Sequence, residues 1–241
     1  SAVAILNRDD AWAVGSAIVD GLPRPLSLHW DGRGWRVVPT PAPPGLGASL
    51  SSIWAGSGQV WAAGTHTPNG YPAQPFVLRW SGGAWERRPD PVESVRPMAI
   101  SSMAATPSGE LLAVGGFRSL RGDGAFVLSG SPRRWAVVPR LPAGRVSESF
   151  SGVTATSDGV WAVGSYNDGG PDRTLIEHRG TTGWGRVPSP NAPNRDSRLF
   201  AVAALPSGEA WAVGTSSGPS ADERTLIVHY CPPGAGSDAG P

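Results

Sequence analysis

A short motif that returns about every 50 residues constrains the fold of this chain more than any other feature. The motif is an apolar pentapeptide that ends in glycine and usually has tryptophan in second place. Its copies lie at residues 11–15, 60–64, 111–115, 160–164 and 210–214. Successive copies start 49, 51, 49 and 50 residues apart, which predicts a chain built from five copies of one structural unit.

Each unit has the pattern of four short β-strands, called a to d here in chain order. In the second unit we expect these strands at residues 50–55, 59–64, 76–80 and 84–88. They are rich in β-branched and aromatic residues and are bounded by Gly, Pro, Asp and Ser. No stretch shows a sustained helical period. The sequence therefore predicts an all-β, five-bladed β-propeller of four-stranded antiparallel blades, with units starting near residues 1, 50, 99, 150 and 199.

The repeat resembles the kelch-like Trp-Ala-Val-Gly repeats of proteins from GC-rich bacteria, which are similar to the central propeller of galactose oxidase. The pentapeptide carries this resemblance together with the tryptophans that open strand d, namely Trp35, Trp85, Trp135 and Trp184. Relatives of this repeat are commonly exported, so the resemblance implies a secreted or cell-surface location in a bacterium. It does not extend to the copper chemistry of galactose oxidase, because no match to that Tyr, His and Cys set is found.

The last unit departs from this pattern. Its strand c ends near Tyr230, and the remaining residues 231–241 have no tryptophan and no strand pattern. We therefore expect residues 1–230 to form a single propeller whose last blade is incomplete or is closed from elsewhere. Residues 231–241 are expected to be a flexible Gly/Pro/Ser tail.

Composition excludes several classes of function. The formal net charge is +1 and there is no basic tract, which argues against nucleic-acid binding. No apolar run approaches the ~18 residues that a membrane span needs. The single cysteine excludes an internal disulfide framework and a cysteine-based zinc cluster. We expect a monomer with no metal and no cofactor.

The strand order places the b–c loops and the d–a linkers on one face, called the top face here. Binding residues are expected there, because function commonly lies in long loops on a rigid scaffold. The candidates from the loops are His66, Tyr71 and Tyr166. Trp54 on strand a is a further candidate, since other units carry smaller residues at its position. For the eight repeated tryptophans of strands b and d, packing between blades is the simpler interpretation.

Three arginines in successive d–a linkers share one position in the repeat. Arg96, Arg145 and Arg195 each lie 16 residues before the second residue of the next pentapeptide. Together they would form an arginine arc that binds a carboxylate, sulfate or phosphate by bidentate hydrogen bonds. The alternative is that each pairs locally with a neighbouring acid, namely Glu93, Glu148 or Asp196.

Two functions of different class follow from these features. The first is a propeller that binds a small anionic molecule, a glycan or a protein on its top face. The alternative is a cofactor-free enzyme, such as a lyase, hydrolase or cyclase, with a pocket on the top face or in the central channel. The sequence leaves the choice between binding module and enzyme open.

Overall fold

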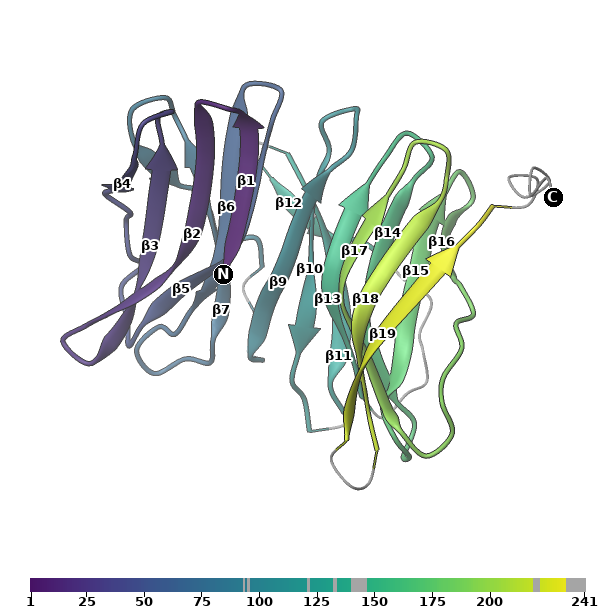
Figure 1. The fold of residues 1–241 in the computed structure, drawn as a ribbon. Coiled ribbons are helices and arrows are strands. Elements are labelled where there is room, and N and C mark those ends of the chain that lie inside the picture. The colour runs from purple at the N-terminus through teal and green to yellow at the C-terminus, as the bar shows by residue number, and fades with distance from the viewer. Residues whose placement is uncertain are drawn as a thin grey trace.

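In the computed structural model, the described residues form nineteen β-strands and no helix (Figure 1). They comprise residues 1–92, 94, 96–120, 122–131, 134–139, 147–218 and 222–232. The strands make five antiparallel sheets, four with four strands and the last with three. This confirms the predicted five-bladed propeller with an incomplete last blade. A search of the described residues for a long apolar helix that could cross a membrane finds none.

Each sheet is one blade, and its strands follow one another in chain order from inside to outside. Blade 1 contains β1 (Ala2–Asn7), β2 (Asp10–Val19), β3 (Leu22–Trp30) and β4 (Trp35–Val38). Blade 2 contains β5 (Ala48–Gly56), β6 (Gln59–His66), β7 (Gln74–Trp80) and β8 (Trp85–Arg87). Blade 3 contains β9 (Met98–Ala105), β10 (Leu111–Phe117), β11 (Gly124–Gly130) and β12 (Trp135–Val137). Blade 4 contains β13 (Ser147–Ala155), β14 (Val160–Asn167), β15 (Arg173–Gly180) and β16 (Gly183–Arg186). Blade 5 contains β17 (Asp196–Ala204), β18 (Ala210–Ser217) and β19 (Glu223–Tyr230).

In blades 2 to 5 the glycine that ends the pentapeptide is required by a close approach of two strands. In blade 2 the pairing of β5 with β6 skips a residue between Leu50 and Ser52, which makes a β-bulge. A Cβ atom at Gly64 would collide with the carbonyl oxygen of Ser49 beside this bulge. The same collision would occur at Gly115, Gly164 and Gly214. The repeated glycine is therefore needed where the backbone of the second strand contacts the backbone of the first strand.

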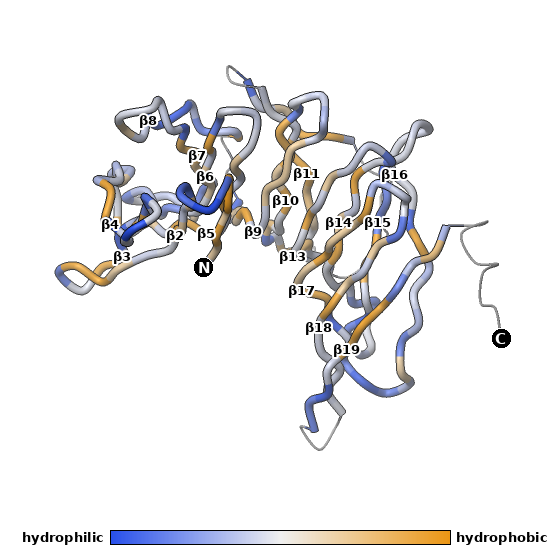
Figure 2. Tube along the Cα trace, turned by 45° about the horizontal axis from the view of Figure 1, so that its top comes forward, coloured by the Kyte–Doolittle hydropathy of each residue, from blue (hydrophilic) through white to orange (hydrophobic). Residues whose placement is uncertain are grey.

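The blades pack face to face in sequence, and their first strands lie side by side around the axis. The tryptophan of the pentapeptide lies in these interfaces, so Trp12, Trp61 and Trp161 are fully buried. Trp211 of blade 5 is 45 % exposed, because no described blade covers its face. Figure 2 shows apolar residues along the strands of every sheet, with polar residues gathered at their ends.

One expectation about the tryptophans of strand d is wrong. The repeat predicts equivalent buried sites for all four, and Trp85 is indeed only 5 % exposed. Trp35 is 47 % exposed, because it lies on the side of blade 1 that has no preceding blade against it. Trp135 and Trp184 are half-buried. Burial at this position therefore depends on the neighbouring blade as well as on the repeat.

Replacing Trp85 by alanine should lower the free energy of unfolding by ~3–5 kcal/mol, the usual cost of removing a buried aromatic ring. Its Nε1 also donates a buried hydrogen bond of 2.8 Å to Ser27 Oγ. Trp35→Ala is the matched control and should cost ~1 kcal/mol or less, since half of that ring is already in water. Urea unfolding followed by circular dichroism measures both. Equal losses would contradict this account of the blade interface.

Candidate functional site

The b–c loops and the d–a linkers lie together on the top face, as the strand order predicts. Backbone hydrogen bonds join them directly, with an amide of one segment donating to a carbonyl of the other. These bonds run from Thr67 to Gly47 (2.9 Å), Met98 to Ala73 (2.9 Å), Arg118 to Pro97 (2.9 Å) and Ser197 to Asp172 (2.7 Å). The top face is therefore a continuous layer of loops held on the blade edges.

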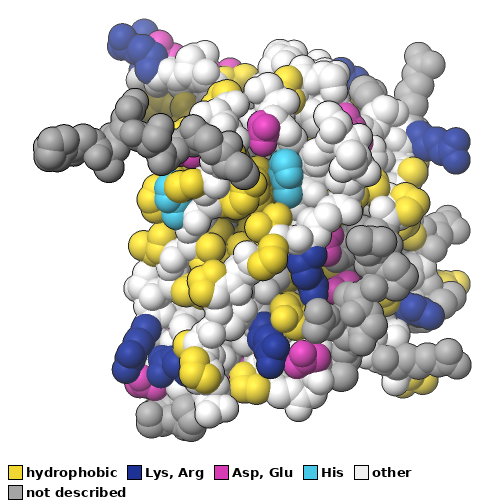
Figure 3. Space-filling model, turned by 90° about the vertical axis from the view of Figure 1, so that its right-hand side faces the viewer, with side chains coloured by type: hydrophobic (Ala, Val, Ile, Leu, Met, Phe, Trp, Pro, Cys, Tyr) yellow, Lys and Arg dark blue, Asp and Glu magenta, His cyan; other side chains and the backbone are white. Residues whose placement is uncertain are grey.

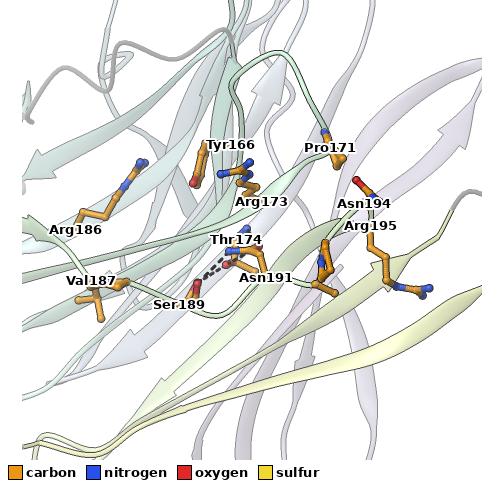
Figure 4. Close-up of a pocket in the computed structure, with 13 residues that line it drawn as sticks. Tyr166, Pro171, Arg173, Thr174, Arg186, Val187, Ser189, Asn191, Asn194 and Arg195 are labelled. Atoms are coloured by element: carbon orange, nitrogen blue, oxygen red, sulfur yellow. Dashed lines mark hydrogen bonds between the residues drawn. The ribbon is translucent and has the colours of Figure 1, made fainter.

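A hollow of about 570 Å³ lies on this face at the outer part of blade 4. It is called the top hollow here. Tyr166 at the end of β14 lines it together with Arg173 and Thr174 at the start of β15. Arg186 of β16 and the linker 187–195 complete its wall (Figure 4).

The linker is fixed against β15 by a small network of hydrogen bonds. The Thr174 side chain is buried, and its hydroxyl is bonded to the hydroxyl of Ser189. The Thr174 amide donates to Asn191 Oδ1 at 2.8 Å, and Asn191 Nδ2 donates to the Ser189 carbonyl at 3.1 Å. This network gives the top hollow a preformed wall, which is the usual condition of a binding site.

An arginine and an aromatic ring lie against each other inside the top hollow. The guanidinium carbon of Arg186 lies 4.6 Å from the centre of the Tyr166 ring. Its Nη2 is buried, forms no hydrogen bond with the described residues, and is 3.8 Å from Glu148 Oε2. Arg173 is half-exposed beside Tyr166, and its Nη1 is 3.8 Å from Asp168 Oδ2 (Figure 4). The hollow therefore presents two cations and one aromatic face.

Two smaller hollows continue from the top hollow towards the axis. Their volumes are about 420 and 330 Å³, and they share Ser147 and Ser149 of β13. The smaller one also shares Tyr166 with the top hollow. Together they form a channel-side band called the axial groove here. Its other polar and aromatic side chains come from Ser101, Phe117, Arg118, Asp123, Glu148, Ser151, Ser165, Asn167, Asp172, Arg198 and Phe200.

Two charged groups in the axial groove, Arg198 and Asp172, form an ion pair. Arg198 Nε donates to Asp172 Oδ2 at 2.5 Å, and Asn167 Nδ2 donates to Asp172 Oδ1 at 3.0 Å. Phe200 is exposed to about half of its surface. The groove thus combines hydroxyl groups, a fixed ion pair and an aromatic ring, a set suited to a polar ligand with apolar faces.

The structure does not bring the arginine arc together within the described residues. Arg195 borders the top hollow, but its guanidinium is turned away to Asp222 (3.0 Å) and Ser216 (Figure 4). This pairing lowers the pKa of Asp222, mainly through the hydrogen bonds from Arg195. Arg96 lies over the Phe117 ring at 5.8 Å, and Arg145 lies outside the described residues. The arc as a ligand site stays a prediction.

The other sequence candidates lie apart from the top hollow, with the exception of Tyr166. Trp54 packs at the interface of blades 2 and 3. His66 is buried edge-on against Phe76, with Nε2 3.7 Å from an oxygen of Asp90. Tyr71 is 70 % exposed on its loop. A ligand role for Trp54, His66 and Tyr71 is untested.

Sequence reasoning did not single out Arg186 and Phe200. The repeat gave no signal for Arg186, because the second residue after the strand-d tryptophan is valine in the first and third units and arginine in the second and fourth, as at Arg87 and Arg186. Phe200 also has no signal in the sequence, because only the fold shows that it is exposed towards the axis.

Comparison with known proteins finds similarity in fold and none in sequence. No protein-family model matches it, and no curated protein matches it in sequence. A solved ulvan lyase of polysaccharide lyase family PL25 is 11 % identical, with 94 % of this chain and 63 % of that chain covered and a TM-score of 0.63. A protein of unknown function from Dyadobacter fermentans is 12 % identical, with 91 % and 71 % covered and a TM-score of 0.60. The Aleuria aurantia lectin in complex with Fucα1-6GlcNAc is 14 % identical, with 96 % and 77 % covered and a TM-score of 0.54.

At these identities the likeness shows a shared β-propeller fold. The chain spans less than two thirds of the ulvan lyase and about three quarters of the lectin. The kelch-like type is not supported by these structures and continues to rest on the repeat motif.

Stability should fall as the pH drops below about 6.5. Burial lowers the pKa of His66 and of His178 below the ordinary value of 6.5, so the folded state binds fewer protons than the unfolded state. Their contribution is present above pH 6.5 and is lost as the pH falls through the lowered pKa values. Melting temperatures measured from pH 7.5 to pH 5 (~0.5-unit steps) test this. His66→Gln should flatten the profile. An equally steep profile in His66→Gln would refute the role of burial.

Proposed function

We propose that this propeller is a carbohydrate-binding module that holds an acidic glycan in the top hollow. The observation that carries the proposal is the Arg186–Tyr166 pair, with the buried Arg186 Nη2 lacking a hydrogen-bond acceptor among the described residues. A buried donor of this kind indicates that water or a ligand completes its bonding. A carboxylate or sulfate group would accept bidentate hydrogen bonds from it.

The surrounding residues suit a sugar ring. Tyr166 offers an aromatic face with a polar hydroxyl, the combination that is enriched where ligands have one apolar and one polar side. Arg173 provides a second cation beside it, and Asn194 lines the rim of the hollow. The axial groove would hold further sugar units, because it shares Tyr166 with the top hollow.

Two similar structures add general support. One is described as a polysaccharide lyase and the other as a lectin with a bound fucosyl sugar. Both share only the fold with this chain, so they support a glycan as the class of partner. Which glycan binds is inferred from the charged and aromatic residues of the top hollow. The kelch-like repeat is compatible with this role, since it supplies the scaffold and leaves the top loops free to vary.

Binding to polysaccharides of different charge tests the proposal. Isothermal titration with polygalacturonate, dextran sulfate and neutral dextran should show binding to an acidic polymer and none to dextran. Arg173→Gln and Arg186→Gln should each weaken binding by ~1–3 kcal/mol, the range for hydrogen bonds to charged groups. Arg33→Gln is the matched control, because Arg33 is exposed in the β3–β4 turn on the opposite face.

Two outcomes would contradict the proposal. The first is equal binding of dextran and the acidic polymers, and the second is an equal loss in Arg33→Gln and Arg173→Gln. Chain-length analysis of the recovered polysaccharide in the same experiment tests the alternative of a cofactor-free enzyme. Shortened chains produced by the wild-type protein and not by Arg186→Gln would favour a lyase or hydrolase that uses the same hollow.

A further inference from the structure

Within the described residues, the outer strand of blade 5 has a free edge. In blades 1 to 4 a short strand d pairs antiparallel with strand c, as β8 does with β7 and β16 with β15. No described strand pairs with the outer edge of β19. Its backbone N–H and C=O groups on that side are therefore available for a ladder with another extended segment.

The repeat shows what normally lies beside such an edge. In blade 2 the strand-d tryptophan, Trp85, packs against two rings, with centroid distances of 5.3 Å to Trp12 and 5.6 Å to Trp80. Trp12 belongs to the preceding blade, and Trp80 ends strand c of the same blade. The three rings form one cluster across the blade interface.

Blade 5 reproduces two of these three rings. Trp161 of blade 4 takes the place of Trp12, and Tyr230 at the end of β19 takes the place of Trp80. Trp161 and Tyr230 lie 4.8 Å apart at 54°, and the corresponding Trp12 and Trp80 lie 4.8 Å apart at 56°. The third ring has no counterpart among the described residues.

A cavity lies at the position of the missing ring. Its volume is about 80 Å³, and its mostly apolar lining includes Trp161, Val187, Val228 and Tyr230. Trp161 is only 1 % exposed, and its Nε1 is buried without a hydrogen-bond partner among the described residues. The cavity therefore offers an apolar slot beside the two rings. Figure 3 looks onto this side of the molecule, where hydrophobic side chains gather at the surface.

We propose that the β19 edge and this cavity bind an extended peptide segment that contains a tryptophan. The segment adds to β19 as a fourth antiparallel strand, and its indole ring enters the cavity against Trp161 and Tyr230. Main-chain hydrogen bonds supply affinity in this mode of recognition, and the side-chain pocket supplies specificity. The other units give the preferred pattern, a tryptophan followed four residues later by proline, as in Trp35 to Pro39.

This peptide site is distinct from the top hollow, although Val187 and Pro188 of the linker border both. It does not depend on the proposed glycan binding. The final residues of the chain, 231–241, contain no tryptophan and so do not match the segment that the cavity requires.

A capped peptide with the sequence of residues 34–39, Gly-Trp-Arg-Val-Val-Pro, is the probe. Titrated into the 241-residue protein, it should bind saturably with one peptide per chain. Replacing its tryptophan by alanine should weaken binding at least ~tenfold, as expected for a buried aromatic anchor. Methylation of alternate backbone amides should also abolish binding, because the added strand would lose its ladder. Absence of binding, or equal binding of the three peptides, would overturn the proposal.

Two variants of β19 locate the site on the protein. Val228→Trp fills the cavity from inside and should abolish peptide binding. Ile227→Trp makes the same substitution on the opposite, exposed face of the strand and should leave binding unchanged. Hydrogen exchange should slow at residues 224–230 when the peptide is bound. Unchanged peptide binding by folded Val228→Trp, or a loss of binding in Ile227→Trp alone, would assign the peptide to the exposed blade face and overturn the proposal. If Val228→Trp does not fold, the methylated peptide and the hydrogen-exchange measurement still test the proposal.

Discussion

The burial of one large apolar side chain between each pair of blades is the contact on which the rest of the structure depends. Trp12, Trp61, Leu112 and Trp161 occupy the equivalent position on the second strand and are almost completely buried. Trp211 has the same position in its own sheet and is nearly half exposed. Burial at this position therefore comes from the next blade. Stability is then a property of neighbouring pairs, as in other repeat architectures.

This packing also sets the geometry of the proposed binding surface. A blade that is fixed on its neighbour holds its b–c loop beside the incoming linker, and backbone hydrogen bonds such as Ser197 to Asp172 join the two. The walls of the top hollow are thus parts of a rigid scaffold, although they belong to loops. A preformed wall reduces the ordering cost when a ligand binds, so more of the contact energy is available for affinity.

The sequence predicted the scaffold well because the repeat reports contacts that every blade must make. The glycine of the pentapeptide marks a close backbone approach at Gly64 and at its equivalents in blades 3 to 5, and the buried tryptophans mark the interfaces. Prediction failed where a position depends on what lies outside its own unit. Trp35 has the motif of Trp85, but no described blade lies against its ring, which is 47 % exposed. Such contacts are fixed by tertiary structure and carry no local signal.

Both proposed sites lie at positions that differ between the units, and there is a physical reason for this. A residue that recurs in every blade is constrained by packing, so it has little freedom to suit one ligand. The position of Arg186 is valine in two units and arginine in the second, and the Arg186 side chain reaches the Tyr166 ring in the top hollow. The described part of blade 5 has no fourth strand, and a cavity lies beside Trp161 where blade 2 has Trp85 beside Trp12. In a propeller of this kind the regular positions build the frame, and the exceptions to the repeat are the places where a ligand can be recognised.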